Sequence, residues 1–484
     1  MPNSQFLSDL AATVDAQGLL TSAEQLRVYE CDGLAAYRQL PLAVVLPTTE
    51  QQVIAVLRCC HRHQVAVVAR GSGTGLSGGA LPVEGGIVLS LTRMNAILNI
   101  NPLGRSARVQ PGVRNAAISE AAASHGLYYA PDPSSQIACS IGGNVAENAG
   151  GVHCLKYGLT VNNLLAVRAI TSEGELLIAG GEAPDQPGLD LLMALTGSEG
   201  LLAVITEITV RLLPKPQVAQ VILAAFPTVG AAGTAVANLI GQGIIPAGLE
   251  LMDQATTRAV ESFVQAGYPT DAAAILLCEA DGTAEEVRAD IEAMSQVLRE
   301  AGATALRVSC SEAERLTFWA GRKAAFPAAA KLAPDYYCMD GTIPRHRLAE
   351  VLDGIAGLAA EHGLACINVF HAGDGNLHPL ILFDANEGDQ LHRAEALGAR
   401  ILELCVAVGG AITGEHGVGL EKINQMCVQF GEAELRQFQA LKAAFDPALL
   451  LNPGKAIPSL HRCAEYGRMH VHQGQLPFSN LPRF

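Results

Sequence analysis

The stretch HAGDGNLHPL, residues 371–380, places two histidines seven residues apart around a glycine-rich centre. Neutral imidazoles that converge beside carboxylates bind divalent metals, so the question is whether the chain brings His371 and His378 together. Gly373 and Gly375 disfavour a helix, and on one straight strand an odd separation points the two side chains to opposite faces. Two histidines hydrogen-bonded at a strand edge would explain the spacing equally well.

The flanking residues favour a hairpin. The runs 366–370 and 377–383 have strand composition, and Gly373-Asp374-Gly375 is typical of the turn between two strands. Such a bend would bring both imidazoles to the same end of a sheet. The sequence therefore predicts a hairpin, and a metal site depends on what else the chain supplies.

The chain has 484 residues, of which 49% are hydrophobic and 16% charged, as in a globular protein of two or three domains. A formal net charge of −15 disfavours nucleic acid and anionic membrane surfaces as main partners. The N-terminus lacks a basic start followed by an apolar run, and the most apolar region, 221–252, is interrupted by glycine and proline. We therefore expect a cytoplasmic protein with neither a signal peptide nor a membrane span.

The 12 cysteines include no CxxC pair. Iron–sulfur clusters and structural zinc sites usually have closely spaced thiolates, so a cluster that passes electrons from this protein would lie on another chain. We expect most of the cysteines to be buried and reduced.

A β-α-β unit precedes a glycine-rich loop. Residues 42–46 predict a buried strand, Thr49 opens a capping box for a helix, and residues 65–69 predict the next buried strand. The loop RGSGTGLSGG, residues 70–79, contains GxGxxG, but strand-like residues 87–91 follow where a nicotinamide-type site requires a helix. The loop still suits a phosphate, because successive amides in a tight turn form an anion-binding concavity. A flexible surface loop is the alternative.

A second stretch, PDPSSQIACSIGGNVAENAGG at residues 131–151, shows neither a helical nor a strand period. A run of this length without regular structure is usually functional, and its small polar residues could line a flat, extended ligand. Beyond Pro214-Lys215-Pro216, strand-like runs alternate with helical stretches, which predicts an α+β domain with an antiparallel sheet. After about residue 428 the chain is helical through Phe445 and continues as an extended tail.

Stretches along nearly the whole chain resemble flavoprotein 2-hydroxyacid dehydrogenases of the vanillyl-alcohol oxidase superfamily. They are RGSGTGLSGG, PDPSSQIACSIGGNVAENAGG, TGSEG, FHAGDGNLHP, ITGEHGVG and LNPGK. Three further stretches, WAGRKAAFP, PDYYCMDGTIPR and HRCAEYGRMHVHQGQLPF, look like the FAD-linked D subunits of the glycolate dehydrogenase (glycolate oxidase) branch. D-lactate and D-2-hydroxyglutarate dehydrogenases are close relatives within this family.

The resemblance implies a two-subdomain FAD-binding fold of the vanillyl-alcohol oxidase (PCMH) type and an α+β cap domain with an antiparallel sheet. We expect residues 1–215 to form the FAD-binding domain and residues 216–428 to form the substrate-binding cap with the metal site. Residues 429–484 are expected to return to the FAD domain. Relatives with covalent flavin carry a histidine in the first glycine-rich loop, and its absence from residues 70–79 predicts non-covalent FAD.

The resemblance also implies which residues contact FAD. They lie in the two glycine-rich loops, in TGSEG and the strand after it, and in LNPGK. They are Arg70, Gly71, Ser72, Gly73, Thr74, Gly75, Ser77, Pro131, Asp132, Ser134, Ser140, Gly143, Asn144, Asn148, Gly150, Glu199, Gly200, Ile205 and Asn452.

In relatives of this kind, the two histidines of the HxGDGNxH stretch and the glutamate of GEHG hold a divalent metal. Carried over, the ligands are His371, His378 and Glu415, with zinc the expected metal and manganese or iron as alternatives. His416 matches the base that contacts the substrate and takes its hydroxyl proton. Asp374 is then a turn residue that could orient a ligand.

The same resemblance places Arg322 on the substrate carboxylate, for which a planar guanidinium fork is suited, and Asn376 beside the substrate. A surface arginine beside Lys323 and a turn asparagine are the alternatives. Relatives that act on hydroxyglutarate carry a lysine where this chain has Cys338. That difference favours a monocarboxylate such as glycolate or D-lactate, although Lys323 or Lys331 could compensate.

We therefore expect an FAD- and metal-dependent dehydrogenase that oxidises glycolate to glyoxylate, with D-lactate next and D-2-hydroxyglutarate after it. An iron–sulfur electron-transfer subunit and a homodimer are compatible with this expectation, and partner subunits could associate the protein with a membrane. A metallohydrolase is a rival, since two histidines, a glutamate and a base also activate water, but it leaves both glycine-rich loops unexplained. A non-catalytic flavin-fold subunit would have little use for the metal ligands and the base.

Overall fold

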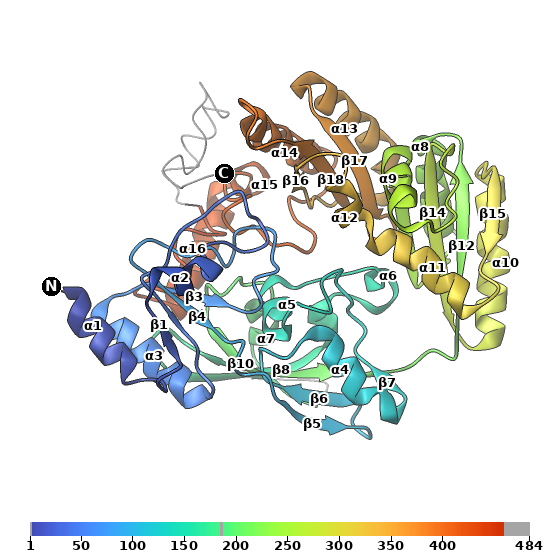
Figure 1. Ribbon diagram of the computed structural model, residues 1–484. Helices are drawn as coiled ribbons and strands as arrows, with labels where there is room; N and C mark the ends of the chain where they lie inside the picture. Colours follow the sequence, from blue (N-terminus) through green and yellow to red (C-terminus); the bar gives the residue numbers. More distant parts are fainter. Residues whose placement is uncertain (1, 184–186, 459–484) are drawn as a thin grey trace. The chain divides into compact units, whose positions relative to one another are not determined.

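The computed structural model describes residues 2–183 and 187–458, which form two compact units (Figure 1). The first unit contains the chain up to Gly150, Leu159–Lys215 and the chain from His416, and the second contains Gly151–Gly158 and Pro216–Glu415. The chain thus re-enters the first unit at His416, earlier than the boundary expected at residue 428. This point lies within the GEHGVG stretch, which is divided between the two units. The tail stretch HRCAEYGRMHVHQGQLPF lies outside the described residues.

The first unit contains these helices: α1 Pro2–Ala11, α2 Ala23–Leu26, α3 Glu50–His63, α4 Asn115–Ala122, α5 Ile141–Glu147, α7 Leu191–Leu195, α15 Met426–Gln429 and α16 Glu432–Phe445. Its strands are β1 Leu19–Leu20, β2 Ala43–Val45, β3 Val67–Arg70, β4 Ile87–Ser90, β5 Ile97–Asn101, β6 Ser106–Val109, β7 Leu127–Tyr128, β8 Leu164–Ile170, β9 Leu176–Gly180, β10 Val204–Arg211 and β11 Leu213–Pro214.

Two sheets organise the first unit. The smaller has the order β1-β2-β4-β3, and its strands β2, β4 and β3 are parallel. The larger has the order β5-β6-β10-β8-β9 and is antiparallel. The predicted β-α-β unit is confirmed: β2 leads into α3, whose N-cap Thr49 accepts a hydrogen bond from the Gln52 amide, and β3 then leads into the first glycine-rich loop.

The second glycine-rich stretch is more regular than expected. Residues 141–147 form helix α5, which begins after Ser140 and ends at Asn148, a residue with φ of +54°. Gly142 and Gly143 lie in its first turn, and their poor helix propensity hid this helix from the sequence pattern. Tertiary packing overrides that propensity, since Ile141 and Val145 are buried in the unit's core.

The second unit contains these helices: α6 Cys154–Tyr157, α8 Val229–Gly241, α9 Gln254–Val264, α10 Ala284–Glu300, α11 Glu312–Lys323, α12 Ala325–Ala329, α13 Leu348–His362 and α14 Gln390–Ala407. Its strands are β12 Val218–Phe226, β13 Gly248–Asp253, β14 Ala274–Gly282, β15 Ala305–Val308, β16 Asp335–Cys338, β17 Ala365–His371 and β18 Asn376–Phe383.

These strands form one sheet with the order β15-β12-β14-β13-β17-β18-β16, and every neighbouring pair is antiparallel, as predicted. Helices α9, α11 and α12 pack together against one face of the sheet, and α8, α10, α13 and α14 form the other helical layer (Figure 1). No helix among the described residues is long and apolar enough to cross a membrane.

A buried lysine fastens the C-terminal part of the first unit. On α16, Lys442 donates from Nζ to the Leu201 carbonyl at 2.6 Å, to Asp446 Oδ2 at 2.6 Å and to the Leu451 carbonyl at 2.7 Å. Asp446 is fully buried, and it also accepts from the Leu451 amide at 2.7 Å. The pair therefore ties α16 to the residues that run beside β3.

Lys442→Met is expected to destabilise the first unit by about 3–5 kcal/mol, because it leaves the Asp446 carboxylate buried without its cation. Arg436→Met on the same helix is the matched control. It removes an exposed ion pair with Glu432, which contributes little. Thermal and urea unfolding of both variants make the comparison, and equal stability losses would contradict this account.

Candidate active site

The two histidines of the opening stretch meet on one face of the sheet. Strands β17 and β18 form the predicted hairpin, with His371 opposite Asn376 and Val369 opposite His378. His371 and His378 therefore lie diagonally across the ladder on the same face, and their ring centroids are 5.0 Å apart. Both side chains are buried.

Glu415 completes the cluster. Its Oε1 lies 3.0 Å from His378 Nε2 and 3.3 Å from His371 Nε2, and one ligand atom from each residue lies within 4.8 Å of the others. Four ligands placed tetrahedrally about 2.1 Å from a zinc ion are separated from one another by roughly 3.4 Å. The three predicted ligand residues are thus brought together at separations that suit one metal ion.

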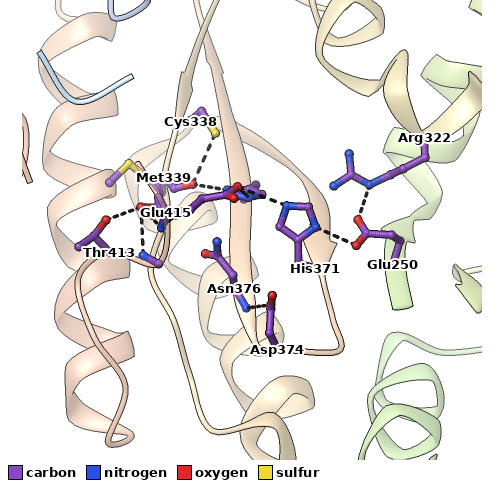
Figure 2. Close-up of polar contacts among 12 residues, drawn as sticks. Glu250, Arg322, Cys338, Met339, His371, Asp374, Asn376, Thr413 and Glu415 are labelled. Atoms are coloured by element: carbon purple, nitrogen blue, oxygen red, sulfur yellow. Dashed lines mark hydrogen bonds and ion pairs between the residues drawn. The ribbon is translucent and has the colours of Figure 1, made fainter. Parts of the chain in front are cut away.

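The far nitrogens of both rings have protein partners. His371 Nδ1 lies 2.8 Å from Glu250 Oε1, and His378 Nδ1 lies 3.2 Å from the Met339 carbonyl (Figure 2). An acceptor at Nδ1 favours a proton on that nitrogen and turns Nε2, the nitrogen that a metal would take, toward Glu415. These contacts are the orienting shell that metal-binding histidines require.

Opposite charges in this cluster shift the ionisation equilibria strongly. Burial raises the pKa of Glu415, but His371 and His378 more than offset that effect and hold it well below its usual range. Burial lowers the pKa of His378, but the Cys338 thiol and the Glu415 carboxylate raise it to about 10. Burial also lowers the pKa of His371, but the carboxylates of Glu250 and Glu415 more than offset it and raise that pKa well above its usual range. The carboxylates of this cluster thus strongly stabilise a positive charge next to them, on the imidazole rings or on a bound cation.

Arg322 lies on α11, on the same sheet face as the histidines. It is only 1% exposed, so the interpretation as a surface arginine is wrong. Its Nε donates to Glu250 Oε2 at 2.6 Å, while its buried Nη2 has no hydrogen-bond partner among the described residues (Figure 2). The buried Oδ1 of Asn376 also has none there. Asp374 is a turn residue, since its Oδ1 accepts from the Asn376 amide at 3.0 Å.

Glu250 was not found from the sequence. It stands in the apolar strand β13, where the register pairs it with His371, and its two oxygens contact His371 and Arg322. A charged residue in the middle of an otherwise apolar run, GLELM, was the available signal. Only the pairing of β13 with β17 reveals its partners.

In the first unit, the two glycine-rich loops approach each other closely. The Ser72 amide donates to Ser140 Oγ at 3.3 Å, and a Cβ on Gly71 would run into that same hydroxyl. Arg70 donates to the Cys31 carbonyl at 2.7 Å, and its guanidinium lies where a Cβ on Gly73 would be. Glycine is required at these positions because neighbouring groups fill the space of a side chain.

Several residues that were expected to contact FAD make hydrogen bonds to other parts of the protein. Glu199 accepts from the Val418 and Gly419 amides, both at 2.7 Å. Asn452 donates from Nδ2 to the Gly79 carbonyl at 3.0 Å and to the Glu199 carbonyl at 2.8 Å. These two side chains brace the loops, and direct contact with FAD is a prediction that their geometry does not test.

Two further asparagines also have protein partners. Asn144 Oδ1 accepts from Asn115 at 3.0 Å, and Asn148 Oδ1 accepts from the Val161 amide at 2.9 Å. The remaining expected contacts all lie in this unit. They are Thr74 and Gly75 in the first loop, Pro131, Asp132 and Ser134 before α5, Gly143 within it, Gly150 after it, Gly200 in a turn and Ile205 on β10.

The first loop has polar atoms that suit a ligand. Ser77 Oγ and Glu147 Oε2 are buried and have no hydrogen-bond partner among the described residues. A Cβ on Gly79 would lie 2.9 Å from Glu147 Oε1, and one on Gly417 would run into Oε2, so glycine backbone surrounds this carboxyl. Burial and then the neighbouring Glu199 raise the pKa of Glu147 well above its usual range. Such a cradle, with unpaired buried groups, fits a large polar cofactor.

His416 begins the part of the chain that returns to the first unit, and it is partly buried. The next residue, Gly417, has φ of +80°, and its carbonyl oxygen accepts a hydrogen bond from Lys422 Nζ at 2.8 Å. With Glu199 on the amides of residues 418 and 419, the backbone directly after His416 is fixed.

Known protein families match both the part of the chain with the glycine-rich loops and the part with the histidine cluster. Residues 41–180 match the family described as FAD binding domain, and residues 215–456 match FAD linked oxidases, C-terminal domain. A relative, glycolate oxidase subunit GlcD of Escherichia coli (strain K12), is 64% identical over 96% of this chain and 93% of its own length. The chain belongs to the FAD-linked oxidases.

This FAD-linked oxidase is similar to other members as well. Glycolate oxidase subunit GlcD of Bacillus subtilis is 39% identical over 88% of the chain and 91% of its own length. D-lactate dehydrogenase of Anaerostipes hadrus is 32% identical over the same shares of each chain. The predicted resemblance is thus confirmed, and the protein is an FAD-dependent oxidoreductase.

Solved structures confirm the fold of this FAD-linked oxidase. A structure of p-cresol methylhydroxylase matches with a TM-score of 0.81 at 18% identity, over 95% of this chain and 98% of that one. Alkyldihydroxyacetonephosphate synthase matches with a TM-score of 0.74, also at 18% identity, over 93% and 86%. The predicted PCMH-type fold with an antiparallel cap sheet is therefore correct.

Gly71→Ala is expected to weaken FAD binding by about tenfold or more, because the new methyl group overpacks the contact between the two loops. Gly71→Ala/Ser140→Ala should recover most of the affinity, since the hydroxyl that the methyl group meets is removed. Titration of apoprotein with FAD, followed by flavin fluorescence, measures both variants. A double variant as weak as the single one would show that this loop contact does not govern FAD affinity.

Proposed function

We propose that this protein oxidises glycolate to glyoxylate and passes the electrons to FAD. The observation that carries the choice of glycolate is the 64% identity, over 96% of the chain, to a protein named glycolate oxidase subunit. D-lactate is the second candidate, because a D-lactate dehydrogenase is 32% identical over 88% of the chain. D-2-hydroxyglutarate comes after both.

The polar groups of the second unit support a small monocarboxylate. Arg322 is buried beside the metal-ligand cluster and has one unpartnered nitrogen, as a carboxylate-binding guanidinium would. The side-chain carbonyl oxygen of Asn376 accepts no hydrogen bond from the described residues, so it could accept one from the substrate hydroxyl group. At the position where hydroxyglutarate-specific relatives carry a lysine stands Cys338, a buried thiol without a positive charge.

His371, His378 and Glu415 would hold the divalent metal. Two imidazoles and one carboxylate suit zinc best, and manganese and iron also accept this ligand set. A metal in this position would polarise the substrate hydroxyl and lower its pKa. The protein's part is to hold each Nδ1 through Glu250 and Met339, so that Nε2 is the ring atom turned toward Glu415 and would bind the metal.

Oxidation of glycolate removes a proton from the hydroxyl group and a hydride from the neighbouring carbon, which leaves the carbonyl of glyoxylate. FAD supplies the two-electron acceptor for this hydride. His416 takes the proton as a general base, and Arg322 holds the carboxylate so that the substrate keeps one orientation. The rigid backbone after His416 supports a fixed position for that base.

An iron–sulfur electron-transfer subunit is proposed as the partner that reoxidises the flavin. The relatives' names describe subunits, and this chain has no CxxC pair to hold a cluster itself. A homodimer, and a cytoplasmic location with membrane association through partner subunits, complete the proposal.

Steady-state kinetics on the purified protein with an artificial electron acceptor test the substrate. Glycolate should give the highest kcat/KM, followed by D-lactate, with L-lactate and D-2-hydroxyglutarate lower. Monocarboxylates are favoured because the buried guanidinium of Arg322 can bind one carboxylate. At the position of Cys338 no second cation is present to bind the other carboxylate of D-2-hydroxyglutarate. Best turnover of D-2-hydroxyglutarate would contradict the monocarboxylate assignment.

His371→Ala and His378→Ala should each lower bound metal and turnover together while FAD is retained, because these residues belong to the second unit. His416→Ala should keep metal and FAD but lose about 10²–10⁴-fold in kcat, as expected when a general base is removed. Elemental analysis, flavin absorbance and rates are measured on the same samples.

Full metal content in both the His371 and the His378 variants would refute the proposed coordination. Metal loss in the His416 variant would make that residue a ligand instead of the base.

The flavin is proposed to be bound non-covalently, because residues 70–79 contain no histidine. Precipitation of the protein with acid should therefore release all of the yellow colour into the supernatant. Colour that stays with the washed pellet would indicate a covalent bond to another residue.

A further inference from the structure

The segment Met339–Ile343 lies between two parts of the chain that carry metal ligands. On one side it pairs with the start of β18, where the Leu377 amide donates to the Gly341 carbonyl at 2.9 Å and the Met339 amide donates to the Pro379 carbonyl at 3.0 Å. On the other side Thr342 and Ala411 exchange both backbone hydrogen bonds, at 2.9 and 3.0 Å. It is therefore the backbone link that sets the Glu415 segment beside His378.

One side chain of this segment holds the residues around Glu415 directly. Asp340 is fully buried, and its Oδ2 accepts from Thr413 Oγ1 at 2.5 Å and from the Gly414 amide at 3.1 Å, an amide that also donates to the Asp340 main-chain carbonyl at 2.8 Å. Its Oδ1 accepts from the Glu415 amide at 3.2 Å. Three donors on consecutive residues thus converge on one carboxylate, and the last belongs to the ligand residue itself.

Two glycines show how closely this segment is fitted. A Cβ on Gly410 would run into the Thr342 carbonyl oxygen, and one on Gly414 would lie 2.5–2.7 Å from the side-chain amide of Asn376. The path of residues 410–415 therefore leaves no room for a shift toward the sheet. Loss of the Asp340 contacts would remove the carboxylate that holds the Glu415 amide in this closely fitted path.

We propose that Asp340 is a positioning residue that fixes Glu415 opposite His371 and His378 and thereby sets the site's affinity for a divalent cation. This inference rests on the metal site of the proposed function. Metal affinity depends on such contacts because a ligand that is already in place loses little freedom on binding, and outer-shell partners typically change metal affinity by about 10–100-fold.

Zinc titration of the metal-stripped, FAD-loaded protein against a chromophoric chelator tests the proposal. Asp340→Asn should weaken zinc binding by about 10–100-fold, since an amide offers only one acceptor oxygen to the three donors. Thr413→Val removes a single donor, keeps the carboxylate and should have a smaller effect in the same direction. Hydrogen exchange should show faster exchange of the Glu415 amide in Asp340→Asn, whereas the Gly414 amide keeps its bond to the Asp340 main-chain carbonyl.

Asp253→Asn is the matched control. Asp253 lies on β13 of the same unit, and its partly buried carboxylate accepts from the Thr256 and Asn368 amides, both at 2.8 Å. This variant should lose comparable stability, with faster exchange at its own amides, while zinc affinity stays within about twofold of the wild type.

Wild-type zinc affinity in Asp340→Asn, with the Glu415 amide deprotected, would overturn the positioning role. Equal zinc losses in Asp340→Asn and Asp253→Asn would overturn it too, because general destabilisation would then explain both. Wild-type protein that binds neither zinc nor manganese would refute the metal site itself, a failure distinct from the first two.

Discussion

The buried carboxylate of Glu250 is the constraint on which the arrangement of the proposed active site depends. Its two oxygens face two different groups, His371 at 2.8 Å and Arg322 at 2.6 Å, and almost none of it is exposed. A carboxylate buried in this way is stable only with such partners, since an unpaired one costs several kcal/mol. Glu250 therefore holds the imidazole of His371, a proposed metal ligand, at a fixed separation from the guanidinium of Arg322, the proposed carboxylate-binding group.

The same design recurs farther along that face of the sheet. On the neighbouring strand β14, buried Glu279 accepts from Arg315 at 2.8 Å and from the indole of Trp319, and it lies 3.1 Å from His153 Nε2. Arg315 and Arg322 are seven residues apart on α11, so they lie on one side of that helix. Two carboxylate–arginine pairs thus dock α11 on the sheet, and only the pair at Glu250 also reaches a proposed metal ligand.

Local patterns predicted the parts of this structure that depend on local chemistry. The hairpin of β17 and β18 followed from its turn residues, and α3 followed from the capping residue Thr49. Helix α5 was missed because two glycines in its first turn outweighed the rest of its pattern. The proximity of His371 and His378 needed only one turn, so it could be predicted.

The residues that orient the site could not be predicted in this way. Glu250 and His371 are 121 positions apart, and they meet because β13 pairs with β17 in one register. Asp340 and Glu415 are 75 apart and meet through an isolated bridge outside the named strands. Neither pairing leaves a periodic or motif signal, since long-range register is set by the packing of the whole sheet.

The most direct test of this account measures zinc affinity and the KM for glycolate in Glu250→Gln, with Glu279→Gln as the matched control. Both substitutions place a neutral amide in a buried carboxylate position on the same sheet face. The account predicts that Glu250→Gln weakens zinc binding by about 10–100-fold and raises KM as well, while Glu279→Gln changes stability alone. Unchanged zinc affinity and KM in Glu250→Gln, or the same changes in both variants, would contradict it.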